Sequence, residues 1–239
     1  MKTPDIQFPE GIQARFEDAP ESVALILANA VADFLRERLA SAERASLVVS
    51  GGSTPVPFFE ALSNKALDWH RVDVLLADER WVDEEDPASN TRLVRDHLLK
   101  GETAAARYLP LKAEGRAPID ALARVSAGLK DLALPLDVVI LGMGNDGHTA
   151  SLFPDAPEIA RAMNAQSSEW VVEMSPPSQP HPRISLTRPI LEAARFTALH
   201  LKGRDKLETL KRALSEPEDV LAMPIRAFLK PGLQVFWSP

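Results

Sequence analysis

Cysteine is absent from this 239-residue chain, and glycine is scarce at 11 residues. The lack of cysteine excludes disulfides, thiolate metal sites and cysteine nucleophiles, and it is compatible with a reducing compartment such as the cytoplasm. Five of the 11 glycines, Gly51, Gly52, Gly142, Gly144 and Gly147, lie in two short segments. Because glycine lets the backbone approach another group closely, these segments are the first candidates for a binding site.

Positive charge and long apolar runs are also in short supply. The chain has 27 basic and 34 acidic side chains, a formal net charge of −7 at pH 7, which argues against a nucleic-acid partner. No run approaches about 18 apolar residues, and the N-terminal MKTPDIQFPE has no apolar signal core. We therefore expect a cytoplasmic protein with no membrane span, and the 45% hydrophobic composition is typical of an ordinary globular protein.

Apolar runs typical of buried strands alternate along the chain with amphipathic segments typical of helices. The first helix has Asp18 as its expected N-cap residue and buries one face between Val23 and Leu35. The other predicted helices cover residues 89–99, 118–133 and 204–214, and the predicted strands cover residues 47–49, 72–77, 136–141, 169–174, 183–187, 196–201 and 233–237. This alternation predicts an α/β fold with a mainly parallel sheet, in a single domain over residues 1–239.

Polar loops follow three of the predicted strands directly. They are SGGSTP at residues 50–55, DER at residues 78–80 and GMGNDGH at residues 142–148. Ligands of parallel sheets bind beyond the carboxyl ends of the strands. We therefore expect the three loops to meet at one edge of the sheet.

The first loop has the character of an anion site. Gly51 and Gly52 permit close approach, and Ser53 and Thr54 add hydroxyls at the start of a helix whose first turn suits Pro55. The loop lacks the lysine and the spacing of the nucleotide-binding P-loop, which favours a small phosphorylated ligand over a nucleoside triphosphate. The alternative is an ordinary strand-to-helix turn capped by Ser53 or Thr54.

The second glycine segment matches the dinucleotide fingerprint G-x-G-x-x-G at Gly142, Gly144 and Gly147. That fingerprint should open a sustained helix, whereas Pro154 and Pro157 limit any helix here to about one or two turns. The polar residues between the glycines are also unusual for a dinucleotide loop. We therefore interpret the segment as a turn with a different purpose.

That purpose is the presentation of His148. An imidazole has an unperturbed pKa of about 6.5, so it can remove a proton from water near neutral pH. Asp146, two residues earlier, can hold the imidazole in one tautomer, as a carboxylate does in a catalytic triad. The alternative is that His148 only caps or packs.

Three cationic side chains are candidates for binding a phosphate or an oxyanion: Arg80, Arg183 and Lys206. For Arg183 or Lys206 taken alone, a surface ion pair is the more common explanation. The acidic residues Asp78 and Glu79 do not predict a metal site, because no histidine pair or recognised ligand spacing accompanies them.

Together these segments resemble the 6-phosphogluconolactonase family, which is related to glucosamine-6-phosphate deaminase. The matching segments are SGGSTP (50–55), ADER (77–80), SN (89–90), LGMGNDGHTASLFP (141–154), RISLT (183–187) and the G-x-x-K of residues 203–206. They span almost the whole chain in the expected order. The long glycine–histidine motif is specific, and the others are individually weak.

The resemblance implies a Rossmann-like fold and the hydrolysis of 6-phospho-D-glucono-1,5-lactone to 6-phosphogluconate, in the oxidative branch of the pentose phosphate pathway, without a cofactor or metal. His148 looks like the general base, assisted by Asp146, and Arg80 looks like a group that stabilises the oxyanion. The phosphate and sugar-binding set looks like Gly51, Gly52, Ser53, Thr54, Arg80, Arg183 and Lys206. Asn90 either contacts sugar hydroxyls or positions the Arg80 loop.

Two other functions stay open at this stage. The deaminases have Glu five residues after the motif histidine and Tyr at the position of Arg80, whereas this chain has Phe153 and an arginine, although it keeps the deaminase base position as Asp78. A non-catalytic sugar-phosphate sensor would need a further module, for which an enzyme core of this size leaves no room. We expect a monomer or a weak homo-oligomer that takes a phosphosugar lactone, and residues 175–182 as a flexible rim over the site.

Overall fold

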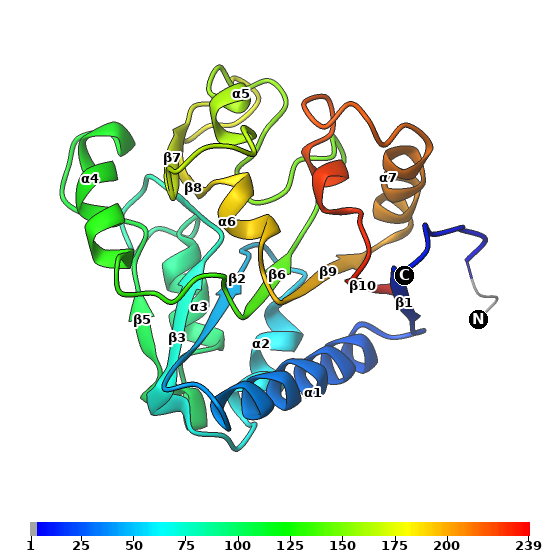
Figure 1. The fold of residues 1–239 in the computed structure, drawn as a ribbon, viewed down its shortest axis with the longest axis horizontal. Coiled ribbons are helices and arrows are strands. Elements are labelled where there is room, and N and C mark those ends of the chain that lie inside the picture. Colours follow the sequence, from blue (N-terminus) through cyan, green and yellow to red (C-terminus); the bar gives the residue numbers. More distant parts are fainter. Residues whose placement is uncertain (1–3) are drawn as a thin grey trace.

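Seven strands form the central sheet of the computed structural model, which describes residues 4–239. Their order across the sheet is β1 (Gln13–Phe16), β10 (Leu233–Ser238), β9 (Phe196–Lys202), β6 (Val138–Leu141), β2 (Ala45–Val49), β3 (Val72–Leu76) and β5 (Arg107–Leu109). Every neighbouring pair is parallel, which confirms the predicted mainly parallel sheet (Figure 1). Residues 1–3, part of the segment expected to lack a signal core, lie outside the described residues.

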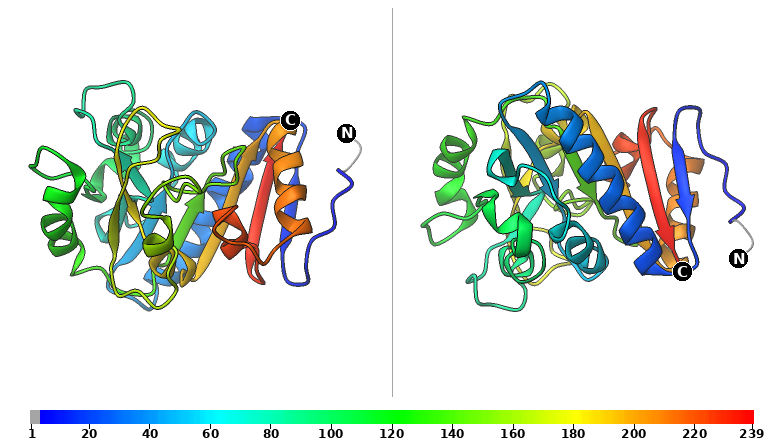
Figure 2. Two further views of the ribbon diagram at one scale, coloured as in Figure 1. Left: turned by 90° about the horizontal axis from the view of Figure 1, so that it is seen from above. Right: turned by 90° about the horizontal axis from the view of Figure 1, so that it is seen from below.

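Helices cover both faces of this sheet. The helices are α1 (Pro20–Leu39), α2 (Val56–Ser63), α3 (Asn90–His97), α4 (Pro118–Leu129), α5 (Ile159–Ala162), α6 (Arg188–Glu192) and α7 (Arg204–Ser215), with 3₁₀ turns η1 (Trp69–Arg71), η2 (Gly101–Ala105) and η3 (Pro224–Phe228). Figure 2 shows α1 crossing one face of the sheet in the view from below and α7 covering the other face in the view from above. Among residues 4–239, no helix combines the length and the apolar character needed to cross a bilayer.

The first helix differs slightly from its prediction. Its N-cap residue is Ala19 and not Asp18, and Pro20 opens the helix, a position that suits proline because the first helical N–H has no partner within the helix. The buried face includes Val23, Leu27, Val31 and Leu35, at the i, i+4 spacing of one helix side, as expected.

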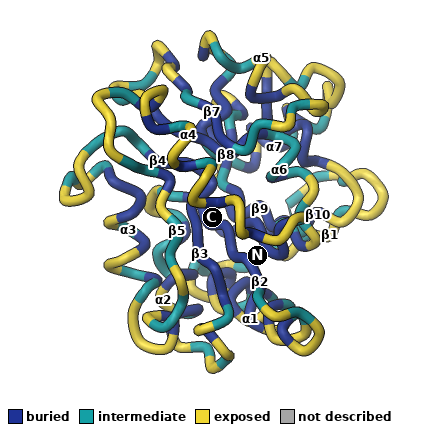
Figure 3. The backbone as a smooth tube through the Cα atoms, turned by 60° about the vertical axis from the view of Figure 1, so that its left-hand side comes forward, coloured by how far each residue is buried: buried dark blue, intermediate teal, exposed yellow. Residues whose placement is uncertain are grey.

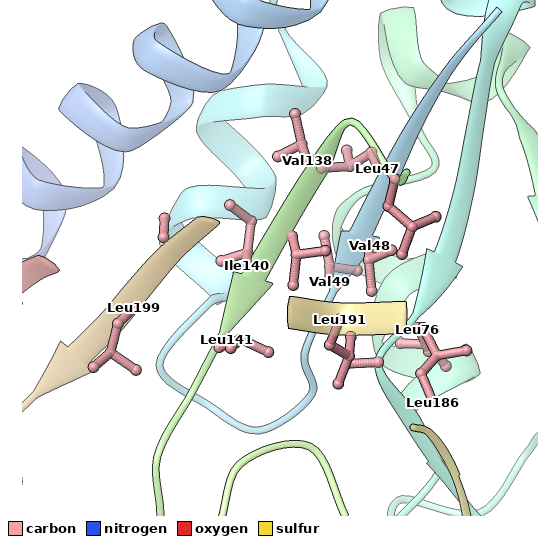
Figure 4. Packing of buried hydrophobic residues seen from close by; sticks show 14 of the residues in the cluster. Leu47, Val48, Val49, Leu76, Val138, Ile140, Leu141, Leu186, Leu191 and Leu199 are labelled. Carbon is pink, nitrogen blue, oxygen red and sulfur yellow. The ribbon is translucent and has the colours of Figure 1, made fainter. Parts of the chain in front are cut away.

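The order in which the chain adds strands to the sheet reverses at the centre of the sheet. Strands β2 and β6 are neighbours; β3 lies beyond β2, while β9 lies beyond β6 on the other side. The β2 and β6 strands are entirely buried, and Figure 4 shows the side chains of residues 47–49 beside those of Val138 and Ile140. The tube in Figure 3 shows that the buried segments gather in the interior of the molecule. The loops that leave these two strands therefore flank the topological switch point, where ligands of open α/β sheets bind.

A second, antiparallel sheet contains two segments that were predicted as strands and corrects the prediction for a third, which was expected to be a loop. It consists of β4 (Asp78–Arg80), β8 (Arg183–Leu186) and β7 (Val171–Met174) in the order β4-β8-β7. The DER segment was expected to be a loop, and the two later strands had no assigned partner. The backbone groups of β4 pair with β8, so that Asp78 lies opposite Ser185 and Arg80 lies opposite Arg183.

Candidate active site

A cavity of about 320 Å³ lies at the carboxyl ends of the parallel strands. It confirms the expectation that the three polar loops meet at one edge of the sheet. The predicted residues that line it are Gly51, Gly52, Ser53, Thr54, Arg80, Asn90, His148, Arg183 and Lys206, while Asp146 stands behind His148. Its size falls at the lower end of the range for small-molecule sites.

The SGGSTP loop is shaped by its two glycines. Gly52 has a φ of 91°, a left-handed conformation that favours glycine, and a Cβ on Gly51 would lie 1.9 Å from Oδ1 of Asn90. The Ser50 hydroxyl donates to the carbonyl of Ile140 on β6 at 2.9 Å, which ties the loop to the neighbouring strand. The N-cap residue of α2 is Pro55, without a side-chain capping bond, so the alternative of capping by Ser53 or Thr54 is wrong.

The second loop presents His148 to the cavity together with Asp146. His148 Nδ1 lies 2.6 Å from Asp146 Oδ1, and the His148 side chain is 25% exposed. Burial by itself raises the pKa of Asp146, but the hydrogen bonds and the charge of His148 outweigh burial and lower this pKa below its ordinary value. Because Nδ1 faces the carboxylate, Nε2 is the nitrogen left for chemistry.

Internal hydrogen bonds and helix α7 hold this loop in place. The N–H of Gly144 donates to the His148 carbonyl at 2.9 Å, and the Thr149 hydroxyl donates to the Gly142 carbonyl at 2.7 Å. Arg212 of α7 donates to the Asn145 carbonyl at 2.6 Å. A tight turn follows the loop where the dinucleotide fingerprint requires a helix, so the glycine spacing here serves the turn.

Two arginines stand directly opposite each other across the β4–β8 pair. Arg183 has a side chain only 6% exposed, 3.7 Å from Asp78 Oδ2, and its Nε is buried without a partner among residues 4–239. Burial lowers the pKa of Arg183, and the charge of Arg80 adds to this effect. Like charges opposite each other on a sheet are unfavourable, so an anion between the two guanidinium groups would relieve the repulsion. The alternative of a surface ion pair is therefore wrong for Arg183.

A buried carboxylate that the sequence argument did not assign supports this region. Glu79 is 2% exposed and accepts hydrogen bonds from the backbone N–H groups of Arg80 at 2.7 Å, Asn90 at 2.9 Å and Thr91 at 2.7 Å. The Asn90 side chain donates to the Asp78 carbonyl at 3.0 Å while it fills the space beside Gly51. These contacts favour the positioning role among the two expected for Asn90. The ADER and SN segments are the sequence signal for this arrangement.

His200 on β9 also lines the cavity, although the sequence offered no reason to rank it above the other histidines. It is 5% exposed, its ring lies edge-on to Phe58 with centroids 6.2 Å apart, and its Nδ1 has no partner within residues 4–239. Burial lowers the pKa of His200 to about 4, so the side chain is neutral at pH 7. A strand buried on both faces does not reveal which of its residues face a ligand.

The cavity is positively charged within an acidic protein. Its charged lining consists of Arg80, Arg183, Lys202, Lys206 and one carboxylate, Asp78. Such a cavity attracts anionic ligands. Within residues 4–239, no group of three or more histidine, aspartate and glutamate side chains is placed to hold a metal ion.

The proline-rich segment 175–182 does not form a rim of this cavity, because none of its residues is among those lining it. The backbone N–H of Ser175 donates to Glu158 at 3.0 Å, and that of Ser178 donates to Asp155 at 2.8 Å. Gln179 accepts a hydrogen bond from Arg183 at 3.0 Å. The segment therefore supports Arg183 from behind the site.

Comparison with known proteins gives consistent results over the whole chain. The sequence profile of the family described as glucosamine-6-phosphate isomerases/6-phosphogluconolactonase matches residues 18–237. A protein of Pseudomonas aeruginosa named 6-phosphogluconolactonase is 45% identical over 239 residues, covering 100% of both chains. One of the same name from Pseudomonas putida is 41% identical, covering 100% of this chain and 98% of its own.

Solved structures agree in fold. A crystal structure of a 6-phosphogluconolactonase from Shewanella baltica superposes with a TM-score of 0.93 at 40% sequence identity and covers 98% of this chain and 100% of its own. A monomeric glucosamine-6-phosphate deaminase shares the fold with a TM-score of 0.76 at 18% identity, covering 95% of this chain and 97% of its own. By profile, full-length identity and fold, the chain belongs to the glucosamine-6-phosphate isomerase/6-phosphogluconolactonase family.

Proposed function

We propose that this protein hydrolyses 6-phospho-D-glucono-1,5-lactone to 6-phosphogluconate, with His148 as the general base. The class of activity, a lactone-hydrolysing enzyme, follows from the full-length identity to curated 6-phosphogluconolactonases. The observation that carries the assignment of the base is the 2.6 Å contact between His148 Nδ1 and Asp146 Oδ1, which leaves Nε2 for the substrate side.

The positive cavity fits a ligand with a phosphate at one end and a carbonyl at the other. In the proposed arrangement, the backbone N–H groups and hydroxyls of residues 51–54 and the cationic groups of Arg183 and Lys206 bind the phosphate and sugar. Binding the remote phosphate orients the lactone, so that C1 lies close to Nε2 of His148. This binding energy contributes to the rate by positioning the reacting atoms.

The chemical step begins with a water molecule between His148 and C1. Nε2 takes a proton from this water as its oxygen forms a bond to C1, and the carbonyl electrons move onto the carbonyl oxygen. Arg80 and the N–H groups of the loop at residues 142–147 stabilise the resulting oxyanion. Asp146 stabilises the imidazolium that forms.

Collapse of this intermediate opens the ring. The oxyanion re-forms the C=O bond, the bond between C1 and the ring oxygen breaks, and the imidazolium returns its proton to the departing ring oxygen. The new carboxylic acid then ionises and releases one proton to solvent. A δ-lactone is an activated ester, so one positioned base, worth about 10²- to 10⁴-fold, together with orientation is sufficient catalysis.

Acid release in a pH-stat tests the proposal with fresh lactone, after subtraction of the spontaneous rate. His148→Ala should lower kcat by about 10²- to 10⁴-fold, because it removes the general base. His70→Ala, at an exposed histidine in η1, should retain wild-type turnover. Wild-type kcat in His148→Ala would exclude His148 as the base.

The two alternatives predict other outcomes. Asp78, at the deaminase base position, accepts a hydrogen bond from Ser151 at 2.5 Å and lies 3.7 Å from Arg183, so it is occupied by buried partners. Release of ammonia from glucosamine 6-phosphate would nevertheless replace our assignment with deamination. Tight binding of 6-phosphogluconate without lactone turnover would replace it with a sensor.

A further inference from the structure

Phe153 contacts both the candidate base and a buried cation, although it has no reactive atoms of its own. The residue is 1% exposed, and its ring stacks on the His148 imidazole with centroids 3.9 Å apart and planes 28° apart. The guanidinium carbon of Arg183 lies 4.9 Å from the centroid of the same ring. An aromatic face favours both stacked rings and cations.

The chain bends sharply between His148 and Phe153 to make this contact. Thr149 and Leu152 form an isolated antiparallel bridge, and the Leu152 N–H donates to the Thr149 carbonyl at 3.0 Å. Inside the turn, Ala150 has a φ of 50°, in the left-handed region that residues with a side chain rarely adopt. Strain of this kind persists where surrounding contacts over-determine the backbone, and it clusters at functional sites.

Two contacts together define the orientation of the imidazole. Asp146 Oδ1, 2.6 Å from Nδ1, sets the rotation of the ring within its plane, and the Phe153 face sets the plane itself. Space on the backbone side is also limited, since a Cβ on Gly144 would lie 2.2 Å from the imidazole. The direction of Nε2 follows from these contacts.

We propose that Phe153 is a positioning residue, whose flat face holds the His148 imidazole in the plane in which Nε2 meets the attacking water. This inference rests on the proposed function. Arg183 depends less on Phe153, because it also contacts Asp78, Ser151 and Gln179. Loss of the aromatic face therefore disturbs the base more than the cation, so kcat falls while KM changes little.

The test compares Phe153→Leu with Phe153→Tyr and with a control, Phe228→Leu. Leucine is apolar but has no flat face, whereas tyrosine keeps one. Phe228 is another buried phenylalanine, 2% exposed, in η3 and outside the cavity. We expect Phe153→Leu to lower kcat about 10- to 100-fold with KM within about threefold of wild type. Phe153→Tyr should restore most of kcat, and Phe228→Leu should leave kcat unchanged per folded molecule.

A spectroscopic measurement separates positioning from a general loss of packing. The Phe153 ring current shifts the Hε1 resonance of His148, and this shift should disappear in Phe153→Leu and persist in Phe153→Tyr and Phe228→Leu. If the leucine variant does not fold, Phe153→Met provides the same test. Wild-type kcat or an unchanged His148 resonance without the aromatic face would overturn the proposal. Failure of the wild-type protein to hydrolyse the lactone would instead overturn the proposed function.

Discussion

Buried charged side chains lie at both the amino ends and the carboxyl ends of the parallel strands, and the two ends differ in how these side chains are paired. At the edge where the strands begin, Asp73 of β3 is 3% exposed and pairs with Arg44 at 2.5 Å and Arg107 at 2.7 Å. Asp137, just before β6, is 2% exposed, pairs with Arg38 at 2.7 Å, and accepts a hydrogen bond from the Ser46 N–H at 2.9 Å. Each buried carboxylate at this edge is satisfied within the protein.

At the edge where the strands end, buried polar groups are left for a ligand. Arg80 and Arg183 lie opposite each other, and Arg183 Nε and His200 Nδ1 are buried without partners among residues 4–239. A buried polar group without a partner costs folding free energy, which a ligand can offset on binding. We therefore expect the paired groups at the amino ends of the strands to stabilise the fold, and the unpartnered groups at the carboxyl ends to lower stability while they serve binding and catalysis.

The largest expected effect concerns His200, which lies in the cavity at the carboxyl ends of the strands. Burial lowers the pKa of this side chain from 6.5 in the unfolded chain to about 4 in the folded protein. The unfolded chain therefore takes up a proton first as the pH falls, and the free energy of unfolding decreases by about 3 kcal/mol between pH 7 and pH 4. Over pH 4.5–6, the stability of His200→Leu should depend on pH less steeply by about 1 kcal/mol per pH unit.

Urea unfolding at a series of pH values measures this slope, and the His200 Hε1 resonance reports the titration directly. A titration midpoint near that of a free histidine, or a slope unchanged in His200→Leu, would show that His200 is well solvated and contradict its description as a buried group without a partner.

The second effect concerns Asp73, at the amino ends of the strands. Burial by itself raises the pKa of Asp73, but the hydrogen bonds from Arg44 and Arg107 outweigh burial and lower it below 3.8. The contribution of this carboxylate to stability is present above pH 3.8 and is lost as the pH falls through the lowered pKa. Asp73→Asn should lower the free energy of unfolding at pH 7 by about 2 kcal/mol.

The matched control for this substitution is Asp33→Asn. Its ion pair with Arg36 is exposed, with side chains 74% and 53% accessible, so its loss should cost less than about 1 kcal/mol. Both variants should keep wild-type kcat and KM per folded molecule. A lower kcat in Asp73→Asn would show that the amino ends of the strands are coupled to the candidate active site.

The smallest effect concerns Lys206, which lines the cavity from the first turn of α7. Lys206→Met removes the charge and keeps the length of the side chain, so KM for the lactone should rise about tenfold through loss of a charged hydrogen bond. Stability should change by less than about 0.5 kcal/mol. Lys211→Met, at a position on the same helix paired with Glu208, should leave KM unchanged. Equal KM values for the two variants would remove Lys206 from the binding site.

The central strands are predictable from the sequence, but the strands at the edges and on the second sheet are not. Residues 47–49 and 138–141 form apolar runs because parallel strands are covered on both faces. Strands β1 and β5 are short and half-exposed, so no such run marks them. The DER segment looks like a loop because its pairing with β8 involves residues about a hundred positions later, which no local pattern records.

The same distinction applies to the site. The local sequence places His148 close to Asp146 and predicts an anion-binding turn at residues 50–55, because each feature depends on residues adjacent in the chain. Folding places Arg80 opposite Arg183, stacks Phe153 on His148, and puts His200 in the cavity with its Nδ1 unpartnered among residues 4–239. The physical reason is that strand pairing and packing choose which side chains from distant or folded-back segments meet, whereas periodicity and composition report only local preference and average burial.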